Sequence, residues 1–268
     1  SVCDESEEQI CKLLNLANQK ALGQENRDML FEYIVIRKPI FIGNYVIINT
    51  IRNVIYRHKT CSDAKWALSK DEIHSWEVLL SELESENLLE KYMWIFEDSY
   101  VEIAEIDRKN LDRNEAFEQV RKNRVVKEIE QVYGFNGICK FVKMVGCPGE
   151  VGESYAYSAD ATTYQQVLDV LLVESEESII NFAKGFFRHY TLRNGTDSVI
   201  SIFNYLSIDK YESIISIPLT VTPCACREMW RFIGTLPVSV QNGYWKNLSI
   251  GFIRNEEVLF LVKKLNEY

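Results

Sequence analysis

The sequence contains few glycine and proline residues, which form many of the turns between β-strands. Only 12 glycines and 5 prolines occur in 268 residues. A β-sandwich or β-barrel needs turn residues about every 8–12 positions, so this scarcity argues against an all-β fold. The sequence also lacks any apolar run of about 18 residues or more, which argues against a membrane-spanning helix. The first ten residues are acidic and lack the apolar region of a signal peptide, and we therefore expect a cytoplasmic protein without membrane contacts.

Cysteine and histidine do not form any recognisable site in the sequence. Seven cysteines, an odd number, are scattered along the chain, and we expect them to be reduced rather than paired. Cys224 and Cys226 are separated by one residue, whereas zinc-binding pairs are separated by about two to four. The three histidines, His58, His74 and His189, each stand alone. We therefore assign no catalytic residue, no metal ligand and no cofactor.

One glycine-rich segment, residues 146–152, can be compared with a phosphate-binding loop. It lacks the Gly-Lys-Ser/Thr ending of that loop, and Pro148 removes one backbone amide that would contact phosphate. We interpret the segment as a turn between two helices. Pro148 fits the first position of the second helix, where no amide hydrogen is needed, and Gly152 would permit close helix packing.

Most of the chain shows the spacing of amphipathic helices. Ser69 and Glu72 have the pattern of a capping box, in which each side chain bonds the other residue's backbone amide. The following residues place an apolar stripe on one helix face, at Ile73, Trp76, Leu79, Leu80 and Leu83. Residues 44–56 are rich in β-branched side chains, which favour strands, but their apolar positions also fit a buried helix. We favour the helix because no partner strand is evident.

Short helices are predicted along the rest of the chain as well. Residues 110–133 carry a recurring apolar stripe, and Gly134 is placed to end that helix. The stripe consists of Phe117, Val120, Val125, Ile129 and Val132. Further helices are expected at 135–145, from 148 on, and at 177–192, 198–206, 207–218, 223–236 and 238–248, followed by a last helix. This pattern predicts an all-α fold, an irregular α-solenoid or helical-repeat array of short antiparallel helix pairs.

Several motifs in the second half of the chain are shared with one kind of protein. Residues 182–186 read FAKGF, residues 236–237 form an LP turn, and residues 244–246 read YWK. Together with the upstream run from Arg124 to Ala156, they resemble the repetitive α-helical region of large, poorly characterised bacterial multidomain proteins. The resemblance covers roughly residues 85–268. It implies an all-helical fold within a longer chain, and it implies no reaction and no functional residues.

We expect two continuous parts, an N-terminal helical part (residues 1–107) with acidic helices and a helical-repeat part (residues 108–268). The chain lacks an initiator methionine and its last residues read as a helix, which suggests a piece of a longer protein, although a natural C-terminal helix would read the same way. The net charge is −9 and is unevenly distributed. Residues 69–107 contain twelve acidic residues and two lysines, a net charge of −10, whereas residues 108–143 contain nine basic and five acidic residues, a net charge of +4.

These charges suggest two surfaces that a partner could contact. Glu82, Glu86 and Glu90 form either a solvated outer face or a patch for a basic partner. Basic residues after position 108 could contact a nucleic acid or another anion, and the candidates are Arg113, Arg121, Lys122, Arg124 and Lys127. The overall negative charge argues against nucleic acid as the main ligand.

The absence of a catalytic motif favours a binding function over an enzymatic one. We expect a helical scaffold or protein-binding module within a larger bacterial protein, such as a sensor or interaction arm. Its partner would be another protein or other domains of the parent chain. A hydrolase-like enzyme with an unrecognised site in an all-α fold is the alternative, and nucleic-acid contact through the helix at 108–143 is a second one.

Overall fold

The computed structural model of the chain describes residues 8–15, 23–97, 111–221, 226–248 and 258–265. Over these ranges the chain consists of helices and turns, with no β-strand, which confirms the predicted all-α class. No described helix combines the length and the apolar character that crossing a membrane would require. The chain divides into two compact units, Ser1–Glu118 (unit 1) and Gln119–Tyr268 (unit 2). The boundary expected between residues 107 and 108 falls outside the described ranges.

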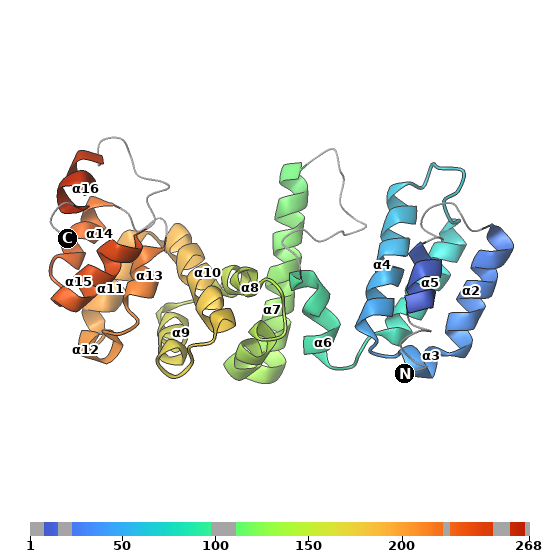
Figure 1. Cartoon of the computed structure of the whole chain (residues 1–268), viewed down its shortest axis with the longest axis horizontal. Helices are drawn as coiled ribbons and strands as arrows, with labels where there is room; N and C mark the ends of the chain where they lie inside the picture. The colour runs from blue at the N-terminus through green and yellow to red at the C-terminus, as the bar shows by residue number, and fades with distance from the viewer. Residues whose placement is uncertain (1–7, 16–22, 98–110, 222–225, 249–257, 266–268) are drawn as a thin grey trace. The chain divides into compact units, whose positions relative to one another are not determined.

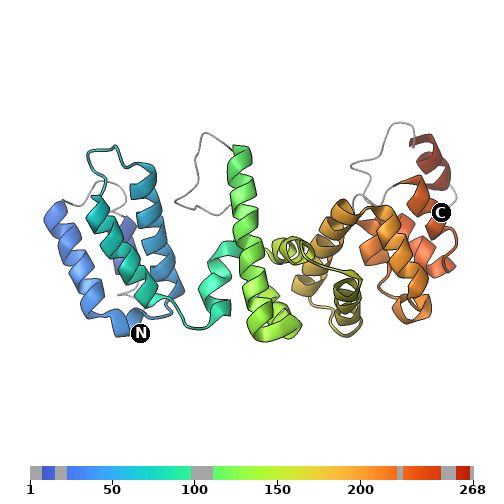
Figure 2. The same ribbon diagram turned by 180° about the vertical axis from the view of Figure 1, so that it is seen from behind.

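Unit 1 begins with helices that lie side by side (Figures 1 and 2), namely residues 8–15, α2 (Gln24–Ile36), α3 (Lys38–Phe41), α4 (Tyr45–Thr60) and α5 (Lys70–Leu83), which surround one apolar core. After them come α6 (Leu88–Tyr92) and the 3-10 helix η1 (Met93–Phe96). The core takes residues from five of these segments and includes Leu14, Ile34, Phe41, Ile51 and Leu83. Burial of these side chains is the main force that holds the unit together.

Residues 45–60 form helix α4, so the helix and not the strand is the correct prediction for residues 44–56. Asn44 precedes the helix, and its side chain accepts a hydrogen bond from the amide of Ile47 at 3.1 Å. Ile47, Ile51, Val54 and Ile55 are buried in the core of unit 1. The spacing of these residues fits 3.6 residues per turn, so their burial outweighs the preference of β-branched side chains for strands.

The predicted capping box is present at the start of α5. The Ser69 hydroxyl accepts from the amide of Glu72, and the Glu72 carboxylate accepts from the amide of Ser69 at 2.7 Å. Of the predicted stripe, Ile73, Trp76, Leu79 and Leu83 are buried and Leu80 packs against the core from a partly buried position.

Loss of the capping hydroxyl should destabilise unit 1 moderately. Replacement of a capping serine by alanine leaves a helix amide without its partner and costs about 1 kcal/mol. We therefore expect Ser69→Ala to lower the unfolding free energy of unit 1 by about that amount. Denaturant unfolding of the variant would measure it, with Ser75→Ala as the control because Ser75 lies inside the same helix and is exposed. Equal stability of the two variants would contradict the role of the cap.

Unit 2 contains the remaining helices, most of them short. They are α7 (Leu111–Val142, which enters the unit at Gln119), α8 (Pro148–Ala156), α9 (Ala161–Val173), α10 (Glu177–Asn194), α11 (Thr196–Tyr205), α12 (Ile208–Tyr211), α13 (Ser216–Thr220), α14 (Arg227–Ile233), α15 (Val238–Asn247) and α16 (Val258–Leu265). Gly134 has φ 65° and interrupts α7 where the sequence predicts a helix end. Pro148 is the first residue of α8, as predicted.

Two sequence-based expectations for α7 and the helices after it are wrong in detail. The predicted stripe on α7 buries Val125 and Ile129, but Phe117, Val120 and Val132 are exposed. Five positions separate Val120 from Val125, a rotation of about 140° around the helix, so the two residues cannot share a face. The helix predicted at 207–218 is two short helices, α12 and α13, with a turn between them. Pro218 is the third residue of α13, where its missing amide hydrogen costs no helical bond.

The closest packing in unit 2 is the crossing of α8 and α10. A methyl group at Gly152 would lie 2.0 Å from the carbonyl oxygen of Phe182, and one at Gly185 would lie 2.0 Å from the carbonyl oxygen of Gly149. Only glycine therefore fits at these two positions, as the sequence indicates for Gly152. Beside the crossing, the buried ring of Tyr155 packs against Phe182 and Phe186, with ring centroids 6.1 and 5.9 Å apart.

Candidate functional site

Helices α2, α3 and α4 meet at one end of unit 1 (Figure 1), and several aliphatic side chains of these segments are exposed. Ile36 is 76% exposed and Ile40 is 63% exposed, and three neighbours are also exposed. We call the side chains of Val35, Ile36, Ile40, Ile42 and Val46 the corner surface. Single exposed aliphatic residues are ordinary on protein surfaces, but a concentration of them is typical of an interaction site.

The corner surface has a fixed position because its backbone is attached to the end of α5. Lys38 pairs with Glu82 at 3.0 Å, and the amide of Gly43 donates to the carbonyl oxygen of Leu83 at 2.9 Å. Gly43 has φ 73°, a conformation that favours glycine and turns the chain sharply into α4. The corner is thus attached to the end of α5 at two points between Ile36 and Val46.

The three predicted acidic residues lie beside this corner rather than on one helix. Glu82 is near the end of α5, Glu86 is in the following turn, and Glu90 is on α6. All three are exposed, although Glu82 pairs with Lys38 and Glu90 accepts from the hydroxyl of Ser85 at 2.7 Å. A small cavity of about 70 Å³, lined by Gly43 and Glu90 among others, connects the corner with α6. We call Glu82, Glu86 and Glu90 the acidic rim.

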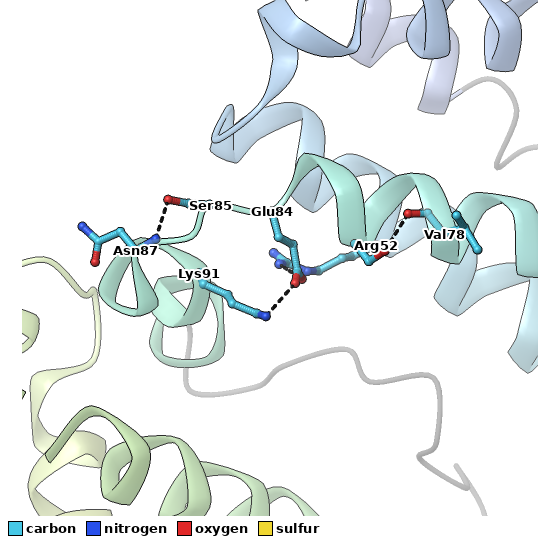
Figure 3. Close-up of polar contacts among 7 residues, drawn as sticks. Arg52, Val78, Glu84, Ser85, Asn87 and Lys91 are labelled. Carbon is cyan, nitrogen blue, oxygen red and sulfur yellow. Dashed lines mark hydrogen bonds and ion pairs between the residues drawn. The ribbon is translucent and has the colours of Figure 1, made fainter. Parts of the chain in front are cut away.

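A more buried group of charges links α4 to α6 through Glu84 (Figure 3). The guanidinium of Arg52, on α4, donates to the Glu84 carboxylate at 2.8 Å, and Lys91 approaches the same carboxylate at 3.4 Å. The Arg52 side chain is only 10% exposed and lies over the ring of Trp94, 4.3 Å from its centroid. Glu84 therefore links α4 to α6, the helix that carries Glu90.

The four predicted basic residues whose side chains are described differ in burial and do not all belong to one exposed surface. Lys122 is 5% exposed, and its ammonium pairs with the Glu150 carboxylate at 2.5 Å, so it is a structural residue of unit 2. Arg121 is half-buried, whereas Arg124 and Lys127 are exposed on α7. Arg113 lies on α7 in a stretch whose side chains are outside the described part. A buried ammonium cannot contact a phosphate, so Lys122 is withdrawn from the candidate contacts.

The histidines occupy three different environments. His58 is buried, and its Nδ1 accepts a hydrogen bond from the amide of Leu68 at 3.0 Å, which makes it part of the core of unit 1. His74 is exposed and lies 3.8 Å from Glu77. Partial burial lowers the pKa of His189 below its usual range, which keeps the ring neutral near pH 7.

The most perturbed acids of unit 2 have a packing role. The Tyr155 hydroxyl donates to Glu130 at 2.8 Å, and burial together with that carboxylate raises the pKa of Tyr155. Burial also raises the pKa of Cys139 to about 11, so its thiol remains protonated and unreactive near pH 7. In the described ranges, no three His, Cys, Asp or Glu side chains are grouped as a metal ion would require.

The corner surface was not predicted from the sequence, although a signal for it exists. The runs Tyr33-Ile34-Val35-Ile36 and Ile40-Phe41-Ile42 are apolar at consecutive positions, and a helix can bury only one side of such a run. Ile34 and Phe41 enter the core, so their neighbours must face outward. Comparison of the chain with models of protein families, with curated proteins and with solved structures found no match.

Proposed function

We propose that the chain is a helical scaffold or protein-binding module that binds another protein through the corner surface of unit 1. The exposure of Val35, Ile36, Ile40, Ile42 and Val46 is the observation that carries this proposal. Full burial of one such side chain contributes about 1.5–3 kcal/mol, so a partner that covered several of them would bind with useful affinity.

The surroundings of the corner surface specify the chemistry of the partner. Protein interfaces combine an apolar centre with a polar margin, and here the margin is the acidic rim. A partner with an apolar contact surface and lysine or arginine residues around it would be attracted by Glu86 and Glu90. In this proposal, the predicted acidic patch is the polar margin of an apolar binding site.

The larger setting of the module belongs to the same proposal. The helical content and the short helices are compatible with an irregular α-solenoid of helix pairs. The resemblance of residues 85–268 to helical regions of large bacterial multidomain proteins suggests an interaction arm in such a protein, active in the cytoplasm. In that setting, the partner is either a separate protein or another domain of the parent chain.

Substitution of the corner residues tests the proposal. We expect Ile36→Ser combined with Ile40→Ser to reduce retention of a specific partner at least about tenfold, because two buried aliphatic contacts would be lost. The chain would be used as bait in an extract of the cells that produce it, and the binding of each retained protein would be repeated with purified components. The matched control is Val173→Ser combined with Leu192→Ser, which removes two exposed aliphatic residues of unit 2.

The two variants give opposite results if the corner surface is the binding site. Wild type and the Val173/Leu192 variant should retain the same purified partner, and the Ile36/Ile40 variant should not. Circular dichroism would verify that all three proteins are equally folded, as expected for exposed positions. Equal retention by the two double variants would contradict the proposal.

A further inference from the structure

Unit 2 has an open cleft on a different surface from the one proposed above. It has a volume of about 670 Å³ and lies between α8, α10, α13 and α15. This volume is within the range of about 300–1,000 Å³ that is typical of ligand sites. All of the described residues that line the cleft belong to unit 2.

The cleft borders the glycine crossing of α8 and α10, where the two helices approach closely. Gly149 and Gly185 are among the residues that line it. The closely packed backbones of these two helices form one wall of the cleft. Lys184 and Arg188 stand on α10 four residues apart, which places them on the same side of the helix.

The charge of the lining is positive in a chain whose net charge is −9. Lys184 is exposed, and within the described residues it makes no ion pair. Arg188 is 54% exposed and lies 3.6 Å from Glu153, an open pair of the kind that contributes little to stability. Two cations against one carboxylate leave an excess of positive charge for a ligand.

Two amide side chains add hydrogen-bonding groups to the cleft. Asn181 is half-buried, and its side chain makes no hydrogen bond to another described residue. The side-chain nitrogen of Asn247 donates to the carbonyl oxygen of Gly243 at 2.8 Å, which fixes the orientation of its amide. An amide side chain contains both a donor and an acceptor and so complements the peptide group of an extended chain.

We infer that this cleft binds an extended acidic peptide segment of a partner protein. Lys184 and Arg188 would pair with its carboxylates, and Asn181 would hydrogen-bond to its backbone. The inference rests on the proposal that the chain binds proteins, but it concerns another unit and other residues. An experiment can therefore contradict the proposal for the corner surface without contradicting the inference for the cleft, and the reverse.

A fluorescent peptide of alternating glutamate and alanine tests the inference with the whole chain. We expect an increase in its anisotropy at low salt, and no increase for the same peptide with glutamine in place of glutamate. Lys184→Gln combined with Arg188→Gln should weaken binding about tenfold or more, because each charge-assisted hydrogen bond contributes about 1.5–3 kcal/mol. Both residues are exposed, so this variant should fold normally.

A charge-matched variant separates the cleft from general electrostatic attraction. Arg124→Gln combined with Lys127→Gln removes two exposed cations of α7 and should change the affinity less than about twofold. The inference would be overturned by equal effects of the two variants, by equal binding of the glutamine peptide, or by the absence of binding at low salt. It would also be overturned if inorganic phosphate bound to the cleft and the glutamate peptide did not. None of these results would change what partner retention by the Ile36/Ile40 variant says about the corner surface.

Discussion

Gly152→Ala should disrupt the crossing of α8 and α10 and destabilise unit 2 strongly. The added methyl group would lie 2.0 Å from the carbonyl oxygen of Phe182 and 2.7 Å from the amide nitrogen of Phe186. Both atoms belong to the backbone of α10, so a side-chain rotation cannot relieve the overlap. We expect a loss of about 3 kcal/mol or more, which exceeds the gain of about 1 kcal/mol in helix propensity.

The neighbouring glycine of the same helix is the matched control. A methyl group at Gly149 would meet only the carbonyl oxygen of Asn181, at an ordinary distance of 3.5 Å. We expect Gly149→Ala to change the stability by less than about 1 kcal/mol, in either direction. Hydrogen exchange measures the result locally, because amides of α8 and α10 should lose protection in Gly152→Ala and keep it in Gly149→Ala. Equal protection in the two variants would show that the helices are not in close contact.

The second large effect is expected at the buried ion pair of unit 2. The Lys122 side chain is 6% exposed, and that of Glu150 is 26% exposed. Glu150→Ala would leave the buried ammonium without this carboxylate, and breaking a buried pair in this way costs about 3 kcal/mol. Lys122→Met should cost much less, because methionine fills similar space without a charge and the more exposed Glu150 can be hydrated.

This asymmetry between the two partners distinguishes a buried pair from a surface pair. The control is Glu176→Gln, which removes an exposed carboxylate that lies 3.0 Å from Lys143. A change below about 0.5 kcal/mol is expected there, because exposed pairs are well hydrated. Thermal or urea unfolding of the three variants would give the comparison. Equal losses for Glu150→Ala and Glu176→Gln would contradict the burial of Lys122.

Features that depend on neighbouring residues were predictable from the sequence. The capping box at Ser69, the start of α8 at Pro148 and the break at Gly134 each follow from local backbone chemistry. The same is true of the close packing at Gly152, since a glycine inside a short helix indicates a close neighbour. The all-α class follows from the sum of such local signals.

Features that depend on distant residues could not be predicted in this way. The burial of Lys122 depends on Glu150, 28 residues further along the chain, and an isolated lysine carries no sign of it. The corner surface depends on which side of α2 and α3 faces the core, and that is decided by the packing of α4 and α5. The cleft depends on the ends of α13 and α15 lying near α10. These arrangements are tertiary and leave no short motif.

The affinity of the purified partner for the wild type and for the Ile36→Ser/Ile40→Ser variant tests the central claim most directly. The proposal predicts a dissociation constant at least about tenfold higher for the variant, with unchanged helical content and unfolding temperature. Neutralising Glu82, Glu86 and Glu90 together should mainly slow association at low salt, because the acidic rim steers the partner rather than holding it. An unchanged dissociation constant in the corner variant would contradict the assignment of this surface as the binding site.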